Sequence, residues 1–292
     1  MKRAVEYQRE AAALLKEGGI AEGELEARML FTQAFGWDFG TWILEKDNQE
    51  IQESDPRLRQ FFAWVRERLT RRPIQYILHS QDFYGLPLYV NENVLIPRQD
   101  TEVLVEAVLH WAQSRPPDTL EVLDLCTGSG AIALALEKNG RFKGVAGLDI
   151  SSKALEVAKR NSAFLKAGVS WILGDMFTGL TENQKYDIIV SNPPYIRSQV
   201  IDTLLPEVRD FEPRLALDGD GDGLGFYRIL AREAGGFLKK KGLLALEIGF
   251  DQGEEVRELC LETGFARVTV EKDLAGLDRV ILAETDIEDQ YV

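Results

Sequence analysis

Asn192-Pro193-Pro194-Tyr195 directly follows the apolar run Ile188-Ile189-Val190. A strand that ends in this way presents a side-chain amide, a backbone carbonyl and an aromatic face within one short loop. The two prolines fix φ and remove two backbone donors, so the loop offers hydrogen-bond acceptors. A planar NH2 group needs two acceptors and a flat surface against its face. The motif therefore predicts chemistry on an NH2 group, although an ordinary proline-rich turn explains these four residues alone equally well.

A glycine-containing loop lies about 65 residues upstream of this motif. The apolar run 122–125 leads into residues 126–130, and residues 131–136 favour a helix. Strand, turn and helix in this order leave backbone N–H groups free at the start of the helix, as nucleotide-binding loops require. A second apolar strand ends at Asp149, 19 residues after Gly130. A carboxylate at that point can accept both hydroxyls of a ribose, so the pattern predicts a nucleoside-containing cofactor.

The loop fits S-adenosylmethionine better than a dinucleotide. A dinucleotide fingerprint needs G-x-G-x-x-G, whereas this loop provides x-x-G-x-G and has no glycine three residues further on. Asp124 would repel a pyrophosphate but attract an ammonium group. We expect Asp149 to bind the ribose and Asp175 or Met176 to lie beside the adenine. The residues expected to contact the cofactor are Asp124, Cys126, Thr127, Gly128, Ser129, Gly130, Asp149, Asp175, Met176 and Asn192.

Two of these carboxylates have a purely structural alternative. Asp124 could be a solvated or cap-like group at the end of a strand. Asp149 could cap the helix that begins near Ser151.

Several segments together resemble a known group of enzymes. The glycine loop, Asp149, Gly174-Asp175-Met176-Phe177 and the Asn-Pro-Pro-Tyr motif resemble class I methyltransferases that act on NH2 groups. Residues 72–77, 96–102 and 212–217 more narrowly resemble the HemK/PrmC family. The resemblance runs from about residue 70 to the C-terminus, and a helical N-terminal region of the expected size precedes it. One departure is Cys126, which stands where such loops usually carry their first glycine. A cysteine adopts positive φ less readily than glycine, so the resemblance leaves open the backbone conformation at this position.

The resemblance implies an α/β fold: a Rossmann-like class I methyltransferase domain with a mixed seven-stranded sheet, plus a small N-terminal helical domain. It implies methyl transfer from S-adenosylmethionine to a glutamine side-chain amide, in the Gly-Gly-Gln motif of class-1 peptide chain release factors. Three alternatives remain open. The substrate could be a glutamine of a ribosomal protein or an exocyclic amine of DNA or RNA, or the protein could be a non-catalytic adaptor.

The same resemblance assigns roles around the NH2 group. Asn192, Pro193 and Tyr195 are the expected catalytic residues: the Asn192 oxygen and the Pro193 carbonyl accept the amide hydrogens, and the Tyr195 ring stacks on the amide. Pro194 completes the substrate loop. Phe83 and Arg98, with Tyr84 beside them, are expected at the entrance for the substrate. No strong general base is expected, because the nitrogen becomes acidic once it is methylated.

Composition and charge restrict the partners. The 292 residues are 45% hydrophobic and 28% charged, which is typical of a soluble globular protein. No apolar stretch approaches about 18 residues, and the first residues lack the apolar core of a signal peptide. Two cysteines and two histidines favour a reducing cytoplasm and no metal site. A net charge of −14 disfavours nucleic acid as a partner. We expect a cytoplasmic monomer with no membrane contact.

Positive charge is concentrated in one stretch of the N-terminal part. Residues 1–90 carry 12 Lys and Arg against 14 Asp and Glu, whereas the remainder carries 22 against 34. Six arginines fall between Arg57 and Arg72, with Glu67 as the only acid. They could form a docking face for an acidic protein, but the solvated side of an amphipathic helix is the favoured interpretation.

The periodicity divides the chain into three parts. Residues 1–82 form a helical, substrate-recognising domain, with helices over 3–17 and 22–35, after Asp38 and from Asp55-Pro56. Residues 83–98 form a hairpin linker that pairs 83–90 with 94–97. Residues 99–292 form the methyltransferase domain, in which strands alternate with helices. Strands are expected near 121–125, 144–149, 169–173, 186–191, 242–248, 267–271 and 278–283, the last two antiparallel.

A calcium-site pattern occurs at Asp218-Gly219-Asp220-Gly221-Asp222-Gly223. Position twelve of such a loop should be a bidentate glutamate, and here it is Ile229. We therefore interpret this segment as a flexible loop near the mouth of the active site.

Overall fold

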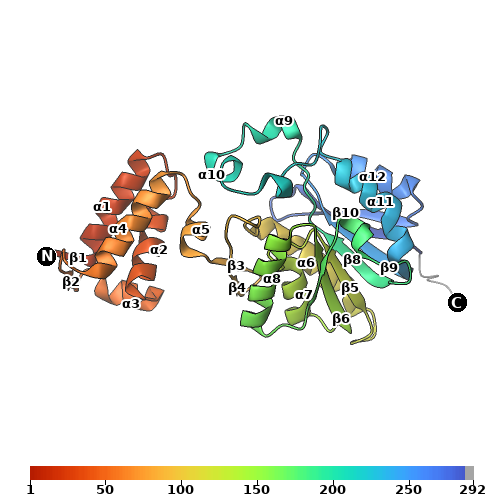
Figure 1. Ribbon diagram of the computed structural model, residues 1–292, viewed down its shortest axis with the longest axis horizontal. Coiled ribbons are helices and arrows are strands. Elements are labelled where there is room, and N and C mark those ends of the chain that lie inside the picture. The colour runs from red at the N-terminus through yellow and green to blue at the C-terminus, as the bar shows by residue number, and fades with distance from the viewer. Residues whose placement is uncertain (287–292) are drawn as a thin grey trace. The chain divides into compact units, whose positions relative to one another are not determined.

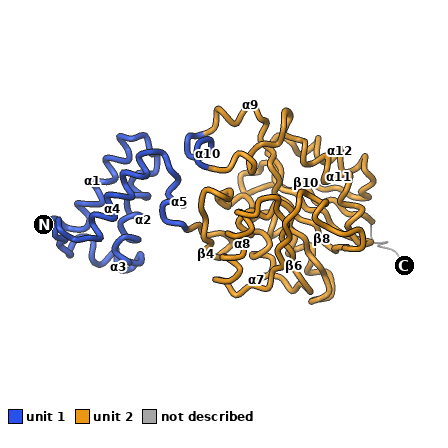
Figure 2. The backbone as a smooth tube through the Cα atoms, viewed as in Figure 1, with its two compact units in different colours: residues 1–79, 205–211 blue, residues 80–204, 212–292 orange. Residues whose placement is uncertain are grey.

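The computed structural model describes residues 1–286, which form two compact units (Figures 1 and 2). Unit 1 comprises residues 1–79 and the separate segment 205–211. Unit 2 comprises the rest of the described chain.

Unit 1 is built from helices and one two-stranded ribbon. Its first two helices begin and end close to where the periodicity predicts, and its next two begin where it predicts. Asp38 accepts a hydrogen bond from the Thr41 N–H at the start of α3, and Asp55 accepts one from the Arg57 N–H at the start of α4. The elements are β1 (Lys2–Arg3), α1 (Ala4–Glu17), α2 (Gly23–Phe35), α3 (Phe39–Glu45), β2 (Glu50–Ile51), α4 (Pro56–Leu69), α5 (Ile74–Leu78) and α10 (Pro206–Arg209).

An aromatic cluster fills the core of unit 1. Phe31 stacks on Phe35 with 4.4 Å between ring centroids, and it meets Phe61 and Trp42 edge to face. Such pairs add to the stabilisation that burial of the rings provides.

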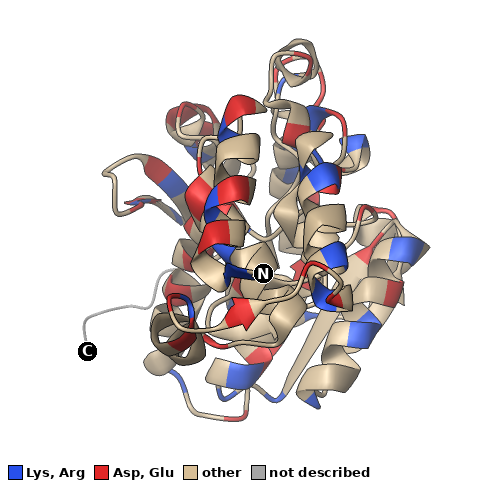
Figure 3. Ribbon diagram, turned by 90° about the vertical axis from the view of Figure 1, so that its left-hand side faces the viewer, with Lys and Arg blue, Asp and Glu red and all other residues tan. Residues whose placement is uncertain are grey.

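The segment 205–211 joins unit 1 through a buried ion-pair network, which the sequence did not predict. Glu207 of α10 accepts hydrogen bonds from Arg68 at 3.0 Å and from Arg71 at 2.8 Å. Arg68 also donates to Glu26 at 2.5 Å. Both basic and acidic side chains lie on the helices of this unit (Figure 3). Arg68 and Arg71, two members of the predicted basic cluster, therefore stabilise the unit internally.

Unit 2 contains a mixed seven-stranded sheet, as predicted. The strand order is β10-β11-β9-β8-β5-β6-β7; β9 to β7 pair parallel, and β11 pairs antiparallel with both β9 and β10. The strands are β5 (Glu121–Leu125), β6 (Gly144–Asp149), β7 (Ser170–Leu173), β8 (Tyr186–Ser191), β9 (Leu238–Glu247), β10 (Arg267–Lys272) and β11 (Asp278–Glu284).

Helices cover both faces of this sheet (Figure 1). Along β5, Val122 faces one apolar cluster together with α6 and α7, whereas Leu123 and Leu125 face another together with α11 and α12. This alternation is the period of two of a strand buried on both sides. The helices of unit 2 are α6 (Glu102–Gln113), α7 (Ala131–Asn139), α8 (Ser152–Leu165), α9 (Ser198–Ile201), α11 (Gly225–Phe237) and α12 (Gly253–Glu262), with the 3-10 turns η1 (Gln99–Thr101), η2 (Met176–Gly179) and η3 (Arg214–Ala216).

The predicted pairing of residues 83–90 with 94–97 is wrong. The hairpin instead pairs β3 (Gln81–Phe83) with β4 (Leu86–Leu88), and its two-residue turn is Tyr84-Gly85. Both turn residues have positive φ, +48° and +74°, as a primed turn requires. Glu102 accepts a hydrogen bond from the Tyr84 N–H at 2.8 Å and stabilises this turn. Residues 94–97 form no strand.

Candidate active site

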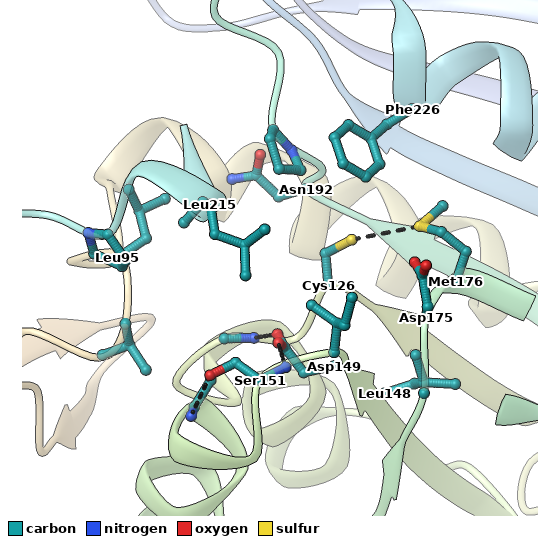
Figure 4. A pocket seen from close by; sticks show the side chains of 18 of the residues that line it. Leu95, Cys126, Leu148, Asp149, Ser151, Asp175, Met176, Asn192, Leu215 and Phe226 are labelled. Atoms are coloured by element: carbon teal, nitrogen blue, oxygen red, sulfur yellow. Dashed lines mark hydrogen bonds between the residues drawn. The ribbon is translucent and has the colours of Figure 1, made fainter. Parts of the chain in front are cut away.

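A cavity of about 370 Å3 opens in unit 2 at the carboxyl ends of β5, β6 and β8 (Figure 4). This is where the strand order reverses around β5, the usual ligand position in such sheets. The volume suits a small-molecule ligand. The lining residues are Asn93, Val94, Leu95, Cys126, Gly128, Leu148, Asp149, Ile150, Ser151, Ala154, Gly174, Asp175, Met176, Asn192, Pro194, Pro213, Leu215, Ala216, Phe226 and Ile229.

Asp149 ends β6 and points into this cavity (Figure 4). One carboxylate oxygen accepts the Ser151 N–H and the other accepts the Gly128 N–H, both at 2.8 Å. Burial raises the pKa of Asp149, and these two hydrogen bonds oppose the rise. Ser151 itself caps α8 through its hydroxyl, which accepts the Ala154 N–H. Asp149 therefore holds the glycine loop in place and keeps free lone pairs for a ligand.

Cys126 adopts the left-handed conformation that the family pattern reserves for glycine. Its φ is +59°, beside +55° at Gly128 and +82° at Gly130. A side chain in this region costs about 1–2 kcal/mol. The Cys126 sulfur lies 3.9 Å from the Met176 sulfur on the cavity wall (Figure 4). Burial raises the pKa of the Cys126 thiol to about 12, so this side chain is a neutral packing group.

The other residues predicted to contact the cofactor from this segment stabilise the loop but do not line the cavity. The carboxylate of Asp124 accepts the Thr127 hydroxyl at 2.5 Å and the Ala133 N–H at 3.2 Å, and its Oδ1 atom has no hydrogen-bond partner among residues 1–286. Burial raises the pKa of Asp124 to about 7. Ser129 is buried, and a side chain at Gly130 would lie 2.7 Å from the Trp171 ring. Asp124, Thr127, Ser129 and Gly130 are outside the cavity wall.

Within the Asn-Pro-Pro-Tyr motif, Asn192 and Pro194 line the cavity, whereas Pro193 and Tyr195 are not among its lining residues. The Asn192 amide donates a hydrogen bond to the Thr101 hydroxyl at 3.2 Å. The Tyr195 hydroxyl donates one to Glu247 at 3.4 Å. The motif is therefore anchored from the side of the protein core.

Residues 218–223, which carry the incomplete calcium-site pattern, pack closely against the Asn-Pro-Pro-Tyr motif. A Cβ atom at Gly219 would lie 2.7 Å from the Tyr195 Cα atom, and one at Gly223 would lie 2.6 Å from the Tyr195 carbonyl oxygen. Gln252 donates to that same oxygen at 3.1 Å. The glycines thus permit a close backbone approach that fixes the motif from outside, and Gln252 is a supporting residue that the sequence did not reveal.

Arg98 and Glu212 tie together two segments of the cavity wall. Their side chains form an ion pair, and Glu212 also accepts the Ile96 N–H at 3.3 Å. Leu95 and Pro213, neighbours of these residues, line the cavity. Burial raises the pKa of Glu212, and Arg98 opposes the rise. The HemK/PrmC-like segments around Arg98 and Glu212 therefore build one wall.

Phe83 and Tyr84 lie elsewhere in unit 2. Phe83 is 1% exposed and belongs to the core that packs against α6 and α7. Tyr84 packs against the same core. Neither lines the cavity, and Arg98 does not line it either.

Within residues 1–286, no group of three His, Cys, Asp or Glu is arranged to hold a metal ion. No helix there has the length and apolar character needed to cross a membrane.

Known proteins match the chain along most of its length. The family model described as PrmC N-terminal domain matches residues 6–78, and the Methyltransferase small domain model matches residues 99–208. A release factor glutamine methyltransferase of Fusobacterium nucleatum is 38% identical over 276 residues, covering 94% of this chain and 77% of the relative. The corresponding protein of Caulobacter vibrioides is 42% identical, covering 92% and 91%.

Solved structures support the fold. A methyltransferase of Pyrococcus furiosus is 18% identical, with a TM-score of 0.51, and covers 70% of this chain and 90% of its own. A T. thermophilus 16S rRNA methyltransferase in complex with AdoMet and guanosine is 19% identical, with a TM-score of 0.53, covering 71% and 50%. At this identity the likeness concerns architecture only. The sequence matches, in contrast, extend over both units, and by them the chain belongs to the family of release factor glutamine methyltransferases.

Proposed function

We propose that the protein transfers a methyl group from S-adenosylmethionine to the side-chain amide nitrogen of the glutamine in the Gly-Gly-Gln motif of class-1 peptide chain release factors. The observation that carries the proposal is the position of the Asn192 amide. It lies in the wall of the same cavity as Asp149, and its NH2 group is held by Thr101. Its oxygen is therefore available to a substrate.

The cavity fits the cofactor. Asp149 retains lone pairs for the ribose hydroxyls, and Asp175 and Met176 line the wall where the adenine would lie. Cys126 and Gly128 line the wall for the methionine part, and Asp124, Thr127, Ser129 and Gly130 shape the loop behind them. Bound there, S-adenosylmethionine supplies an electrophilic methyl group that needs no further activation by the protein.

The residues around Asn192 would then prepare the nucleophile. An amide nitrogen is a weak nucleophile because its lone pair is delocalised into the carbonyl. The Asn192 oxygen and the Pro193 carbonyl accept the two amide hydrogens and so turn the lone pair toward the methyl carbon. Tyr195 stabilises the orientation of the loop through its hydroxyl. Positioning of this kind is the main contribution that the protein makes. After methyl transfer, the nitrogen loses its extra proton to water.

We assign recognition of the protein substrate to the N-terminal helical region, residues 1–82, with residues 83–98 as a linker and residues 99–292 as the methyltransferase domain. The support is the match of residues 6–78 to a domain model specific to this family. The overall charge of −14 supports a protein rather than a nucleic acid as the substrate. We place the reaction in the cytoplasm and expect the protein to act as a monomer.

Transfer of labelled methyl from S-adenosylmethionine to a purified release factor tests this proposal. The control is the same factor with the glutamine of its Gly-Gly-Gln motif changed to alanine. Ribosomal proteins and nucleic acid are incubated in parallel. Label on the intact factor alone is the expected result. Label on ribosomal protein or nucleic acid alone would overturn the choice of substrate.

A further inference from the structure

One segment of the chain, residues 205–217, is divided between the two units, and we call it the strap. The chain passes from unit 2 to unit 1 before residue 205 and returns to unit 2 after residue 211 (Figure 2). The first part of the strap, residues 205–211, is therefore included in unit 1, and the second part, residues 212–217, in unit 2. The function proposed above assigns no role to this arrangement.

Ion pairs hold the first part of the strap within unit 1. The Glu207 carboxylate of α10 accepts hydrogen bonds from Arg68 at 3.0 Å and from Arg71 at 2.8 Å. The Arg68 side chain is only 6% exposed and the Glu207 side chain 17%, so water and salt screen this pair little. The helix α10 itself buries none of its side chains. Its attachment to unit 1 therefore depends on charge more than on apolar packing.

Both arginines are oriented by further contacts within unit 1. The Arg68 Nε atom donates to Glu26 of α2 at 2.5 Å. Arg71 has a left-handed backbone, with φ of +74°, and its guanidinium donates to the Gly19 carbonyl at 2.7 Å. The two guanidinium groups are thus held in place independently of Glu207. They form a prepared binding position for one carboxylate, and removal of that carboxylate leaves buried positive charge uncompensated.

The second part of the strap forms part of the cavity wall. Its lining residues are Pro213, Leu215 and Ala216. The Leu215 side chain points into the cavity (Figure 4). Glu212, at the beginning of this part, forms the ion pair with Arg98. At its end, the Leu217 carbonyl accepts the N–H of Ile196, the residue after the Asn-Pro-Pro-Tyr motif, at 3.0 Å. A displacement of this part would therefore change the shape of the cavity.

We propose that Glu207 is a positioning residue that couples unit 1 to the cavity through the strap. Residues 208–211 are all that separates Glu207 from Glu212, so release of the first part frees the chain next to the cavity wall. The inference rests on the proposed function in one respect, namely that unit 1 binds the protein substrate. Binding of that substrate and binding of S-adenosylmethionine should then strengthen each other by the same factor.

Two states of the strap are sufficient for this coupling. While Glu207 is paired, residues 213–216 are held in the wall, where they meet a cofactor that enters the cavity. When Glu207 is released, these residues move more freely and the cofactor loses part of that contact. A ligand shifts such an equilibrium only by its preference for one state. The cofactor and a substrate bound to unit 1 both prefer the paired state, and this shared preference links the two binding events.

The first experiment needs no substrate. Glu207→Gln keeps the shape of the side chain but removes its charge. The matched control is Glu254→Gln, because the Glu254 side chain is 68% exposed and pairs with Arg257. Amide hydrogen exchange in residues 212–217 should be about tenfold faster in Glu207→Gln than in the control. Exchange in α1 and α8 should be the same in both, which excludes a general loss of structure. Unchanged exchange in residues 212–217 would overturn the proposal.

A double-mutant cycle tests whether the ion pair is the cause. Arg71→Gln alone should also accelerate exchange in residues 212–217. In Glu207→Gln, the further change Arg71→Gln should add less than about twofold, because both substitutions remove the same contact. Fully additive effects would mean that Glu207 acts in another way and would overturn the proposal.

The second experiment measures the coupling itself. A release factor with its Gly-Gly-Gln glutamine changed to alanine accepts no methyl group at that position. Saturation with this factor should strengthen binding of S-adenosylmethionine about fivefold or more in the unsubstituted protein and in Glu254→Gln. In Glu207→Gln the gain should be less than about twofold, and an equal gain would overturn the proposal. A factor that does not bind at all would refute the proposed substrate, whereas faster exchange in Glu207→Gln would still support the role of the strap.

Discussion

Asp149→Asn should weaken binding of S-adenosylmethionine without unfolding the protein. The carboxylate accepts two backbone N–H groups at 2.8 Å, from Gly128 and from Ser151. An asparagine has one oxygen, so in either orientation its NH2 group faces one of these donors and offers the ribose one acceptor fewer. A hydrogen bond to a charged group contributes about 1.5–3 kcal/mol. The dissociation constant should therefore rise about 10- to 150-fold.

Titration calorimetry with S-adenosylmethionine measures this change, and thermal unfolding without ligand controls for the fold. The matched control is Asp118→Asn, which removes the same charge from an exposed carboxylate paired with Arg141. The control should bind the cofactor with unchanged affinity. An affinity of Asp149→Asn within about threefold of the unsubstituted protein would refute the role of Asp149 in cofactor binding.

Three further results are expected. Asn192→Ala should lower kcat by about 10²–10³ but leave the affinity for S-adenosylmethionine within about fivefold; equal losses of both would contradict this division. Gly219→Ala would place a Cβ atom 2.7 Å from the Tyr195 Cα atom, so it should cost about 1–3 kcal/mol in a urea titration and lower kcat, whereas Gly221→Ala, with no atom within 4 Å, should do neither. The unfolding free energy should fall as the pH rises from about 4, the ordinary pKa of a carboxyl group, to about 7, because folding raises the pKa of Asp124 and Glu247 to about 7 and favours their protonated forms. Glu247→Gln should reduce the change in unfolding free energy over this pH range by up to roughly 3 kcal/mol. An unchanged pH dependence of the unfolding free energy would contradict the raised pKa of Glu247.

The strands and the cofactor side of the site could be read from the sequence because their signals are local. Apolar runs mark β5, β6 and β8, and the residues just after or at the end of each strand are the functional ones. Asp149 follows from its spacing to the glycine loop alone. Parallel pairing then brings these ends to one edge of the sheet.

The supporting residues could not be predicted, because their contacts join distant parts of the chain. Thr101 meets Asn192 across 91 residues, and Gln252 meets Tyr195 across 57. The placement of Phe83 failed for another reason: an aromatic residue at a strand end fits a binding entrance and a core equally well. The true hairpin turn was missed because Tyr84 adopts a positive φ that its residue type does not suggest.

Fragmentation mass spectrometry of a release factor, after incubation with the protein and S-adenosylmethionine, tests the central claim most directly. The account predicts a mass increase of one methylene unit on the side chain of the Gly-Gly-Gln glutamine, and no increase when Asn192→Ala is used. Methylation of the factor at another residue, or an unmodified factor beside a methylated nucleic acid or ribosomal protein, would contradict it.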